Sequence, residues 1–266
     1  MKLSFSTLGC PGWSWKEIYA TAFDFGFDGI EIRGLENEMY IPKFPKFADN
    51  NIENIKRIFS GLTKISMLTS GAVIGNPKNV SPFYKEATDY IDLAAKLDVP
   101  FIRLMISPQP YPTEADYKFA VETYKKICTY AKDTGVSPLI ETNGILAETK
   151  KMKQFMKDVN CENGGVLWDI HHPYRFFGES VSETLGNIGE YVKYLHVKDS
   201  EKIDTKIEYR MIGYGDMPVS EVISSLKSLG FEGYLSLEWV KRWLPELQEP
   251  GIVFSHYLNY MSYMLK

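Results

Sequence analysis

Three carboxylates and one imidazole recur at nearly regular intervals in the second half of the sequence. Each stands at or near the end of a short apolar run, and the four residues are Glu141, Asp169, His196 and Glu238. Asp169 follows Glu141 by 28 residues, and His196 follows Asp169 by 27. One βα unit of a (β/α)₈ barrel averages roughly 31 residues, so these side chains recur about once per unit. We therefore expect the four side chains to lie at the same height along the axis of one barrel.

Converging carboxylates repel one another and are costly to bury as bare charge. A divalent cation offsets that repulsion. Three oxygen donors and one nitrogen donor suit Mn²⁺, Zn²⁺, Mg²⁺ or Co²⁺, and the donor set alone does not choose among them. The pattern therefore predicts a site for one divalent metal ion. The competing explanations are ordinary ones: a carboxylate at a strand end also caps helices or forms ion pairs, and a histidine can be a core residue.

Eight short apolar runs, rich in β-branched and aromatic residues, alternate with longer amphipathic stretches. This alternation predicts parallel strands covered by helices, and eight such units predict a closed (β/α)₈ TIM barrel. No low-complexity linker divides the chain, so residues 1–266 are expected to form a single domain. The predicted strands are Leu3–Ser6, Gly29–Ile32, Ile65–Thr69, Phe101–Ile106, Pro138–Glu141, Val166–Asp169, Tyr194–Val197 and Tyr234–Glu238, and clear helical patterns cover Ser81–Leu97, Thr113–Thr134 and Pro218–Leu229.

Residues at the carboxyl ends of barrel strands point into the catalytic mouth. The interval from His196 to Glu238 is longer than the others because it includes the polar segment Lys198–Met217. A long loop at this position is expected to cover the mouth or contact substrate. Glu31 closes the second strand and is a candidate for substrate binding, although an ion pair with a neighbour is equally compatible with its position. Trp15 follows the first strand and is expected either to stack on a sugar or to fill the barrel.

Composition limits the classes of partner. The net charge is -4 at pH 7, which disfavours a nucleic-acid binder, because such proteins carry basic faces. The chain has 3 cysteines, odd in number and far apart, which fits a reducing cytosol. No window approaches the roughly 20 apolar residues of a membrane span, and the first residues are typical of a strand rather than a signal peptide. We expect a cytoplasmic protein that binds a small molecule, and a homo-oligomer is compatible with the sequence.

Several short motifs, in order, resemble those of a known family. They are Glu141–Asn143, Asp169–His172, His196–Asp199, Gly213–Asp216, and Glu238 followed by an aromatic residue. With these motifs, the sequence resembles the xylose-isomerase-like barrel superfamily, specifically its sugar isomerase and epimerase branch. The resemblance implies that the four residues named first bind the metal. It also implies that His172 contacts the substrate and that Arg210 binds a polar or anionic group of it.

The expected activity is isomerisation or epimerisation of a small sugar, sugar phosphate or related polyol ketone. Glu141 and Glu238 are the expected catalytic residues, which exchange a proton with carbon through a cis-enediolate while also touching the metal. A dehydratase or lyase would use the same first step. An abasic-site endonuclease is less compatible, because that chemistry uses three metal ions and many histidines, whereas this chain has 4 and carries Arg210 where a further histidine would be needed. A non-catalytic sugar-binding barrel is the remaining alternative.

Overall fold

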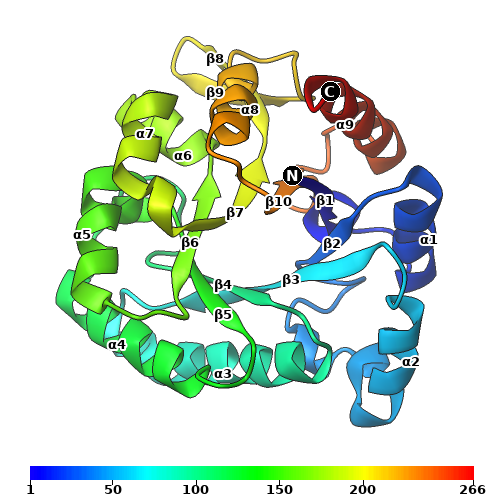
Figure 1. Cartoon of the computed structure of the whole chain (residues 1–266), viewed down its shortest axis with the longest axis horizontal. Coiled ribbons are helices and arrows are strands. Elements are labelled where there is room, and N and C mark those ends of the chain that lie inside the picture. Colours follow the sequence, from blue (N-terminus) through cyan, green and yellow to red (C-terminus); the bar gives the residue numbers. More distant parts are fainter.

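Eight parallel strands close into a barrel, which confirms the predicted (β/α)₈ fold (Figure 1). The computed structural model describes the backbone of residues 1–266 and every side chain except that of Val80. Around the barrel the strands follow the order β1-β10-β7-β6-β5-β4-β3-β2. Their bounds are β1 Lys2–Ser6, β2 Gly29–Ile32, β3 Lys64–Val73, β4 Phe101–Met105, β5 Ser137–Glu141, β6 Gly165–Asp169, β7 Val192–Val197 and β10 Tyr234–Leu237.

Helices form a ring outside the barrel (Figure 1). They hold this position because each buries one apolar face. In α5 the buried residues Met152, Phe155, Met156 and Val159 repeat at helical spacing. Burial of each such side chain stabilises the fold by roughly 1.5–3 kcal/mol. The helices are α1 Trp15–Phe25, α2 Ile52–Ile58, α3 Val80–Lys96, α4 Tyr117–Tyr130, α5 Thr149–Val159, α6 His171–Phe177, α7 Val181–Ile188, α8 Val219–Ser228 and α9 Pro250–Met264.

The boundaries of α1 show how local sequence delivers a strand to the site. Ser14 and Glu17 form a capping box at its first turn, in which the Ser14 side chain accepts from the Glu17 N–H and the Glu17 carboxylate accepts from the Ser14 N–H. Gly26 ends the helix in the left-handed region, with φ 79°, which a side chain would disfavour. The chain then turns directly into β2 and carries Glu31 up the barrel wall.

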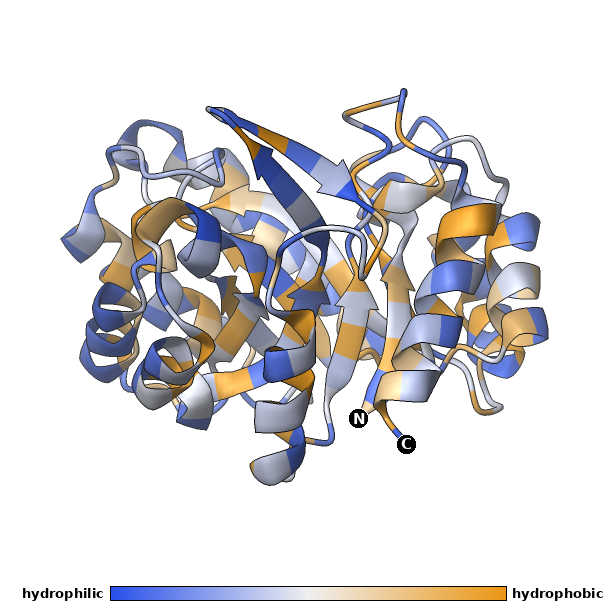
Figure 2. Ribbon diagram, turned by 90° about the horizontal axis from the view of Figure 1, so that it is seen from above, coloured by the Kyte–Doolittle hydropathy of each residue, from blue (hydrophilic) through white to orange (hydrophobic). Residues whose placement is uncertain are grey.

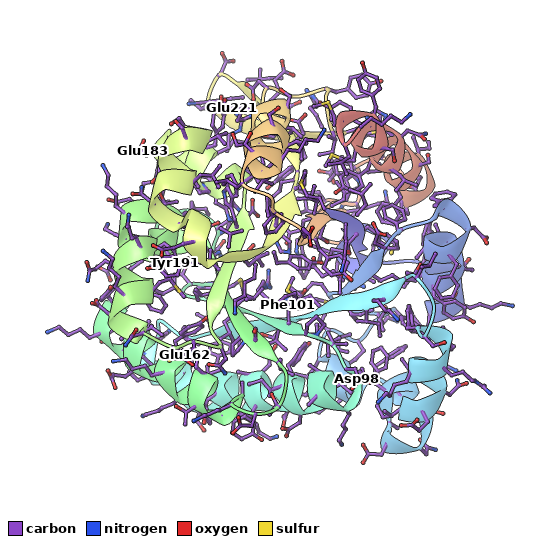
Figure 3. All side chains as sticks on the ribbon, in the orientation of Figure 1. Asp98, Phe101, Glu162, Glu183, Tyr191 and Glu221 are labelled. Atoms are coloured by element: carbon purple, nitrogen blue, oxygen red, sulfur yellow. The ribbon has the colours of Figure 1, made fainter. Side chains whose placement is uncertain are left out.

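The inside of the barrel is layered. Met67, Leu139, Leu167, Tyr194 and Tyr234 form a small apolar cluster, against which Phe101 packs. Phe101 is the first residue of β4, and Figure 3 labels it near the centre of the barrel. Tyr194 belongs to this cluster, and its hydroxyl forms a hydrogen bond of 2.8 Å with the Ser66 hydroxyl. Side chains therefore fill the barrel interior toward the amino ends of the strands, as is usual for this fold.

The polar segment after β7 differs from the predicted loop. It forms an antiparallel hairpin of β8 Asp199–Ile203 and β9 Lys206–Arg210, and Figure 2 shows this hairpin projecting from the end of the barrel opposite both termini. Asp204 makes the turn with a left-handed φ of 54°, so the glycine-containing turn that usually signals a hairpin is absent from its tip. Across the residues that the structure describes, no helix is both long and apolar enough to cross a membrane.

Candidate metal centre

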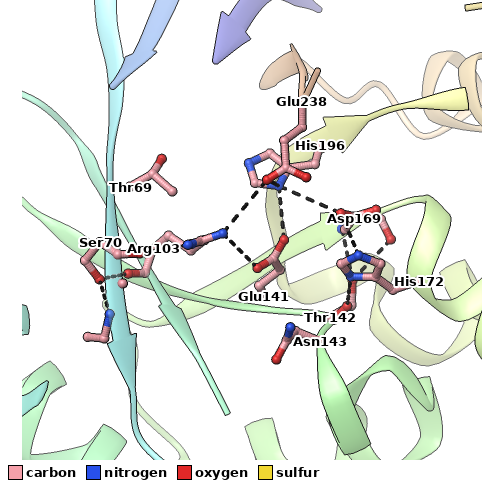
Figure 4. Close-up of polar contacts among 12 residues, drawn as sticks. Thr69, Ser70, Arg103, Glu141, Thr142, Asn143, Asp169, His172, His196 and Glu238 are labelled. Carbon is pink, nitrogen blue, oxygen red and sulfur yellow. Dashed lines mark hydrogen bonds and ion pairs between the residues drawn. The ribbon is translucent and has the colours of Figure 1, made fainter. Parts of the chain in front are cut away.

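Four buried side chains meet at the mouth of the barrel. The donor atoms of Glu141, Asp169, His196 and Glu238 all lie within 4.8 Å of one another (Figure 4). His196 Nδ1 lies 3.1 Å from Glu141 Oε1 and 3.4 Å from Glu238 Oε1. They converge because Asp169 and His196 are register partners on β6 and β7, while Glu141 ends β5 and Glu238 directly follows β10. The structure thus brings together the four residues that the sequence singled out as metal ligands.

Glu31 fixes the orientation of the His196 ring. The Nε2 atom of His196 lies 3.1 Å from each carboxylate oxygen of Glu31, and this leaves Nδ1 facing the other three donors. Glu31 is itself held by the hydroxyls of Ser236 and Thr69, both at 2.7 Å. Burial disfavours the charged imidazole, but Glu31 and Glu238 outweigh it and raise the pKa of His196 well above its usual value. A carboxylate that accepts from the far nitrogen is the usual partner of a metal-binding histidine.

Two buried cations lie against the ligand carboxylates. Arg103 donates to the Ser70 carbonyl at 2.8 Å and to Glu141 at 3.3 Å. Lys198 lies 2.6 Å from Asp169 Oδ2 and also donates to Glu238. Burial raises the pKa of Glu141, yet Arg103 and His196 outweigh it and bring the value to about 2. Glu141 therefore stays ionised at neutral pH, as a metal ligand must.

The surroundings of Asp169 Oδ2 indicate whether a divalent cation would fit this cluster. Asp169 Oδ2 is buried and makes no hydrogen bond of suitable geometry with the described residues, although Lys198 is near it. A buried carboxylate oxygen left in this way is costly unless another group coordinates it. One imidazole nitrogen and three carboxylates within coordinating reach of a common point fit a divalent ion. The cluster is the one of this kind found among the described residues.

Comparison with known proteins places this geometry in a family. Residues 19–253 match the family described as "xylose isomerase-like TIM barrel". The chain belongs to this family. A relative, fructoselysine 3-epimerase of Escherichia coli O157:H7, is 22% identical over 261 residues, which are 92% of this chain and 93% of that protein.

Solved structures share the whole fold of this xylose isomerase-like barrel. The probable 3-DHS dehydratase AsbF of Bacillus anthracis superimposes with a TM-score of 0.81 at 15% identity, over 98% of this chain and 99% of that one. The IolI protein with a binding zinc atom gives a TM-score of 0.82 at 18% identity, over 100% and 98% of the two chains. At these identities the likeness demonstrates a common fold, and chemistry must be argued from the site.

A cavity of about 460 Å³ opens above the ligands of the xylose isomerase-like site. His172 lines it, 5% exposed, with Nδ1 2.9 Å from the Thr142 carbonyl and Nε2 3.3 Å from Asp169 Oδ2. The hairpin contributes Tyr209 to the wall. The remaining lining residues are Leu8, Arg33, Arg103, Met105, Pro108, Gln109, Pro110, Glu141, Asn143, Lys198, Glu238, Val240, Trp243 and Leu244. The position of His172 is compatible with its predicted contact with substrate.

Three residues predicted to bind substrate lie elsewhere. Glu31 is fully buried beneath the ligands and contacts His196 instead of the cavity. Trp15 packs on Phe47 and Phe59 outside the barrel, because it opens α1, whose apolar face covers the strands. Arg210 forms ion pairs with carboxylates of its own hairpin, because β9 turns its side chain away from the cavity. None of the three residues lines the cavity, in contrast to the position that their predicted contact with substrate requires.

Arg103 and Lys198 are site residues that the sequence analysis did not assign. Each had a local signal. Arg103 interrupts the apolar run Phe101–Met105, and a charged residue inside a buried strand needs a partner. Lys198 follows His196 by two positions, so both side chains point to the same face of the extended chain. Arg33 stands in the same relation to Glu31, and it reaches the cavity wall.

Proposed function

We propose that this chain is a divalent-metal-dependent isomerase or epimerase of a small sugar, sugar phosphate or related polyol ketone. The convergence of one imidazole and three carboxylates at the floor of the cavity carries the proposal. The activity named for the relative from Escherichia coli, a sugar 3-epimerase, supports the reaction class. The cavity also has room for a sugar, because its volume of about 460 Å³ lies in the range of small-molecule pockets, roughly 300–1,000 Å³.

Glu141, Asp169, His196 and Glu238 would hold the ion. Such an ion would polarise a substrate carbonyl and its neighbouring hydroxyl, which acidifies the C–H bond between them. The proposal leaves Mn²⁺, Zn²⁺, Mg²⁺ and Co²⁺ as alternatives, and the zinc named for IolI favours including zinc in any test panel. Glu31 would keep the Nε2 proton on His196, so that Nδ1 presents its lone pair.

Glu141 and Glu238 are the proposed acid–base pair. Their pKa values lie below the usual range, Glu141 at about 2, because Arg103, Lys198 and His196 outweigh the effect of burial. Both therefore enter the reaction as carboxylates. One removes the proton from carbon and leaves an enediolate. The other takes a proton from water and delivers it to carbon, and the first carboxyl group then loses its proton to water. Return to the opposite face of the same carbon gives epimerisation, whereas return to the neighbouring carbon gives isomerisation.

Elimination of water is the alternative outcome of the same first step. After proton removal, an enediolate that carries a hydroxyl on the next carbon can expel it. Lys198, which lies 2.6 Å from Asp169 Oδ2 and donates to Glu238, is a cationic donor available for the departing hydroxyl. A dehydratase therefore needs no different metal site. The fate of the substrate, and not the ligand set, separates the two reactions.

Proton exchange with solvent tests the proposal. Metal-loaded protein is incubated in D₂O with a panel of ketoses, their phosphates and polyol ketones, and NMR follows deuterium at carbon. We expect incorporation with retained composition, and loss of at least about 100-fold in rate for Glu141→Gln and Glu238→Gln. Glu162→Gln, an exposed loop substitution, is the matched control and keeps wild-type exchange. Full exchange in both site variants would contradict the mechanism, and release of water would assign a dehydratase.

A further inference from the structure

Arg33 is a cation without a partner at the cavity wall. It follows β2, two residues beyond Glu31, and its side chain is partly buried and lines the cavity. Among the described residues, its guanidinium takes part in no hydrogen bond and no ion pair, whereas its backbone N–H donates to Thr7 at 2.8 Å. Burial, reinforced by the like charge of Arg103, lowers the pKa of Arg33 to about 10. An arginine in such surroundings is costly to keep without an anion.

Glu86, whose carboxylate lies near Arg33 beside Gly71, forms no ion pair with it among the described residues. Glu86 Oε1 accepts the Gly71 N–H at 2.6 Å, which directs this carboxylate to the backbone of β3. Gly71 lacks a side chain, and a Cβ there would lie 3.3 Å from Glu86 Oε1 and 3.5 Å from Arg33 Nη2. The guanidinium therefore passes close over β3 toward the cavity, and its donors remain available.

The other cations at the cavity are already engaged. Arg103 donates to Ser70 and Glu141, and Lys198 lies between Asp169 and Glu238. The cavity lining thus contains three cations and two carboxylates, Glu141 and Glu238. A divalent ion would add two further positive charges at the floor. Among the described residues, Arg33 is the cation of this lining whose side-chain donors have no hydrogen-bond or ion-pair partner.

We propose that Arg33 is the recognition residue for an anionic group, a carboxylate or a phosphate ester, on the sugar derivative that enters this cavity. The inference rests on the proposed function and specifies the class of its substrate. A guanidinium presents paired donors that match the two oxygens of either anion. The role that the sequence analysis gave to Arg210 is thereby taken by Arg33, which follows β2, whereas Arg210 is paired with Glu201 and Glu208.

Binding of matched probes tests the inference without turnover. Calorimetry measures the Kd of D-fructose, D-fructose 6-phosphate and D-gluconate for the full chain, with Mn²⁺ and after EDTA treatment. At least one anionic probe is expected to bind about tenfold or more tightly than D-fructose, since a hydrogen-bonded charge pair contributes about 1.5–3 kcal/mol. Whichever anion binds more tightly identifies the phosphate or the carboxylate as the natural group.

Substitutions of Arg33 test whether this residue causes the tighter binding of anionic probes. Arg33→Gln should abolish the advantage of the anion, and Arg33→Lys should retain part of it. Arg57→Gln, on the exposed face of α2, is the matched control and should change each Kd less than twofold. Equal binding of D-fructose and both anions by the wild type, or wild-type anion binding in Arg33→Gln, overturns the inference. The wild-type comparison and Arg33→Lys decide the matter if Arg33→Gln does not fold.

The two proposals fail in different ways. An absent anion preference, together with metal binding and deuterium exchange on neutral sugars, would contradict the role of Arg33 and leave the isomerase proposal standing. Absent exchange in every loaded sample, together with a preference for anions lost in Arg33→Gln, would contradict the proposed reaction and leave the anion site standing.

Discussion

The Nε2 atom of His196 lies 3.1 Å from both carboxylate oxygens of Glu31, although the two residues are 165 positions apart in the chain. β7 and β2 are not neighbours in the barrel, so closure of the sheet is what brings them together. This contact holds the imidazole so that Nδ1 faces Glu141, Asp169 and Glu238. Glu31 would therefore act on a bound metal ion through His196.

Glu31→Gln should weaken metal binding without removing a ligand. The amide keeps an acceptor for the Nε2 proton but loses the negative charge that makes the imidazole a stronger donor. We expect Mn²⁺ affinity to fall about 10- to 100-fold, with the stoichiometry unchanged. Calorimetric titration measures both quantities, and Glu162→Gln provides the exposed control. An affinity equal to that of the wild type would show that Glu31 is only a structural partner.

Metal-free protein should lose stability in acid through Glu141. The pKa of its carboxyl group is lowered from 4.5 to about 2, chiefly because Arg103 outweighs the effect of burial. The carboxylate thus stabilises the fold above pH 4.5, and this contribution is lost as the pH falls toward 2.

Urea unfolding in EDTA at pH 7 and pH 3 measures this effect. Between these pH values, the wild type should lose about 2 kcal/mol more unfolding free energy than Glu141→Gln, by linkage of the two pKa values. Glu162→Gln should follow the wild type. An equal loss in wild type and Glu141→Gln would mean that Arg103 does not stabilise the ionised form.

Lys198 would compete with a bound metal ion for oxygens of Asp169 and Glu238. It lies 2.6 Å from Asp169 Oδ2 and donates to Glu238. Lys198→Met should therefore lower the melting temperature in EDTA, because buried carboxylates lose a counter-charge. It should also raise Mn²⁺ affinity about tenfold, so that the stabilisation by metal grows. Differential scanning fluorimetry with and without Mn²⁺ measures this, with the exposed Lys118→Met as control. Weaker metal binding in Lys198→Met would assign Lys198 a role in holding the ligands in place.

Substitution of Trp15 should affect the stability of the fold, whereas substitution of Trp243 should affect the binding of a sugar. Trp15 is buried among Tyr19, Phe47 and Phe59, so Trp15→Ala should cost about 3–5 kcal/mol of unfolding free energy and leave Mn²⁺ affinity within twofold. Trp243 is 55% exposed at the cavity rim, so Trp243→Ala should change stability little and weaken the binding of a sugar. Urea unfolding and calorimetry check both variants, and the reverse pattern would return Trp15 to the site.

The fold was predictable because its signals are local and repeated. Short β-branched runs separated by amphipathic stretches specify strands and helices, and Gly26 marks where one helix must stop. The hairpin of β8 and β9 was missed, since Asp204 supplies its turn without a glycine. A two-stranded ribbon that buries little apolar surface has a mostly polar sequence, and such a sequence is easily taken for a loop.

The convergence of Glu141, Asp169, His196 and Glu238 was predictable because barrel topology places side chains that recur at a regular spacing along the chain at one level in space. That argument works for Asp169 and His196, which are register partners. It fails for Trp15, because position after a strand does not say whether the chain has already turned into the outer helix. It also cannot reveal which cation neutralises which carboxylate, and Arg103 reaches Glu141 only because β4 and β5 are adjacent.

Anomalous scattering from a crystal soaked in Mn²⁺ tests the metal centre most directly. A single peak should appear within about 2.0–2.4 Å of donor atoms from Glu141, Asp169, His196 and Glu238, and it should vanish in an otherwise folded Asp169→Asn crystal. No peak at the cavity floor, with Lys198 still seated between Asp169 and Glu238, would contradict the metal-dependent account.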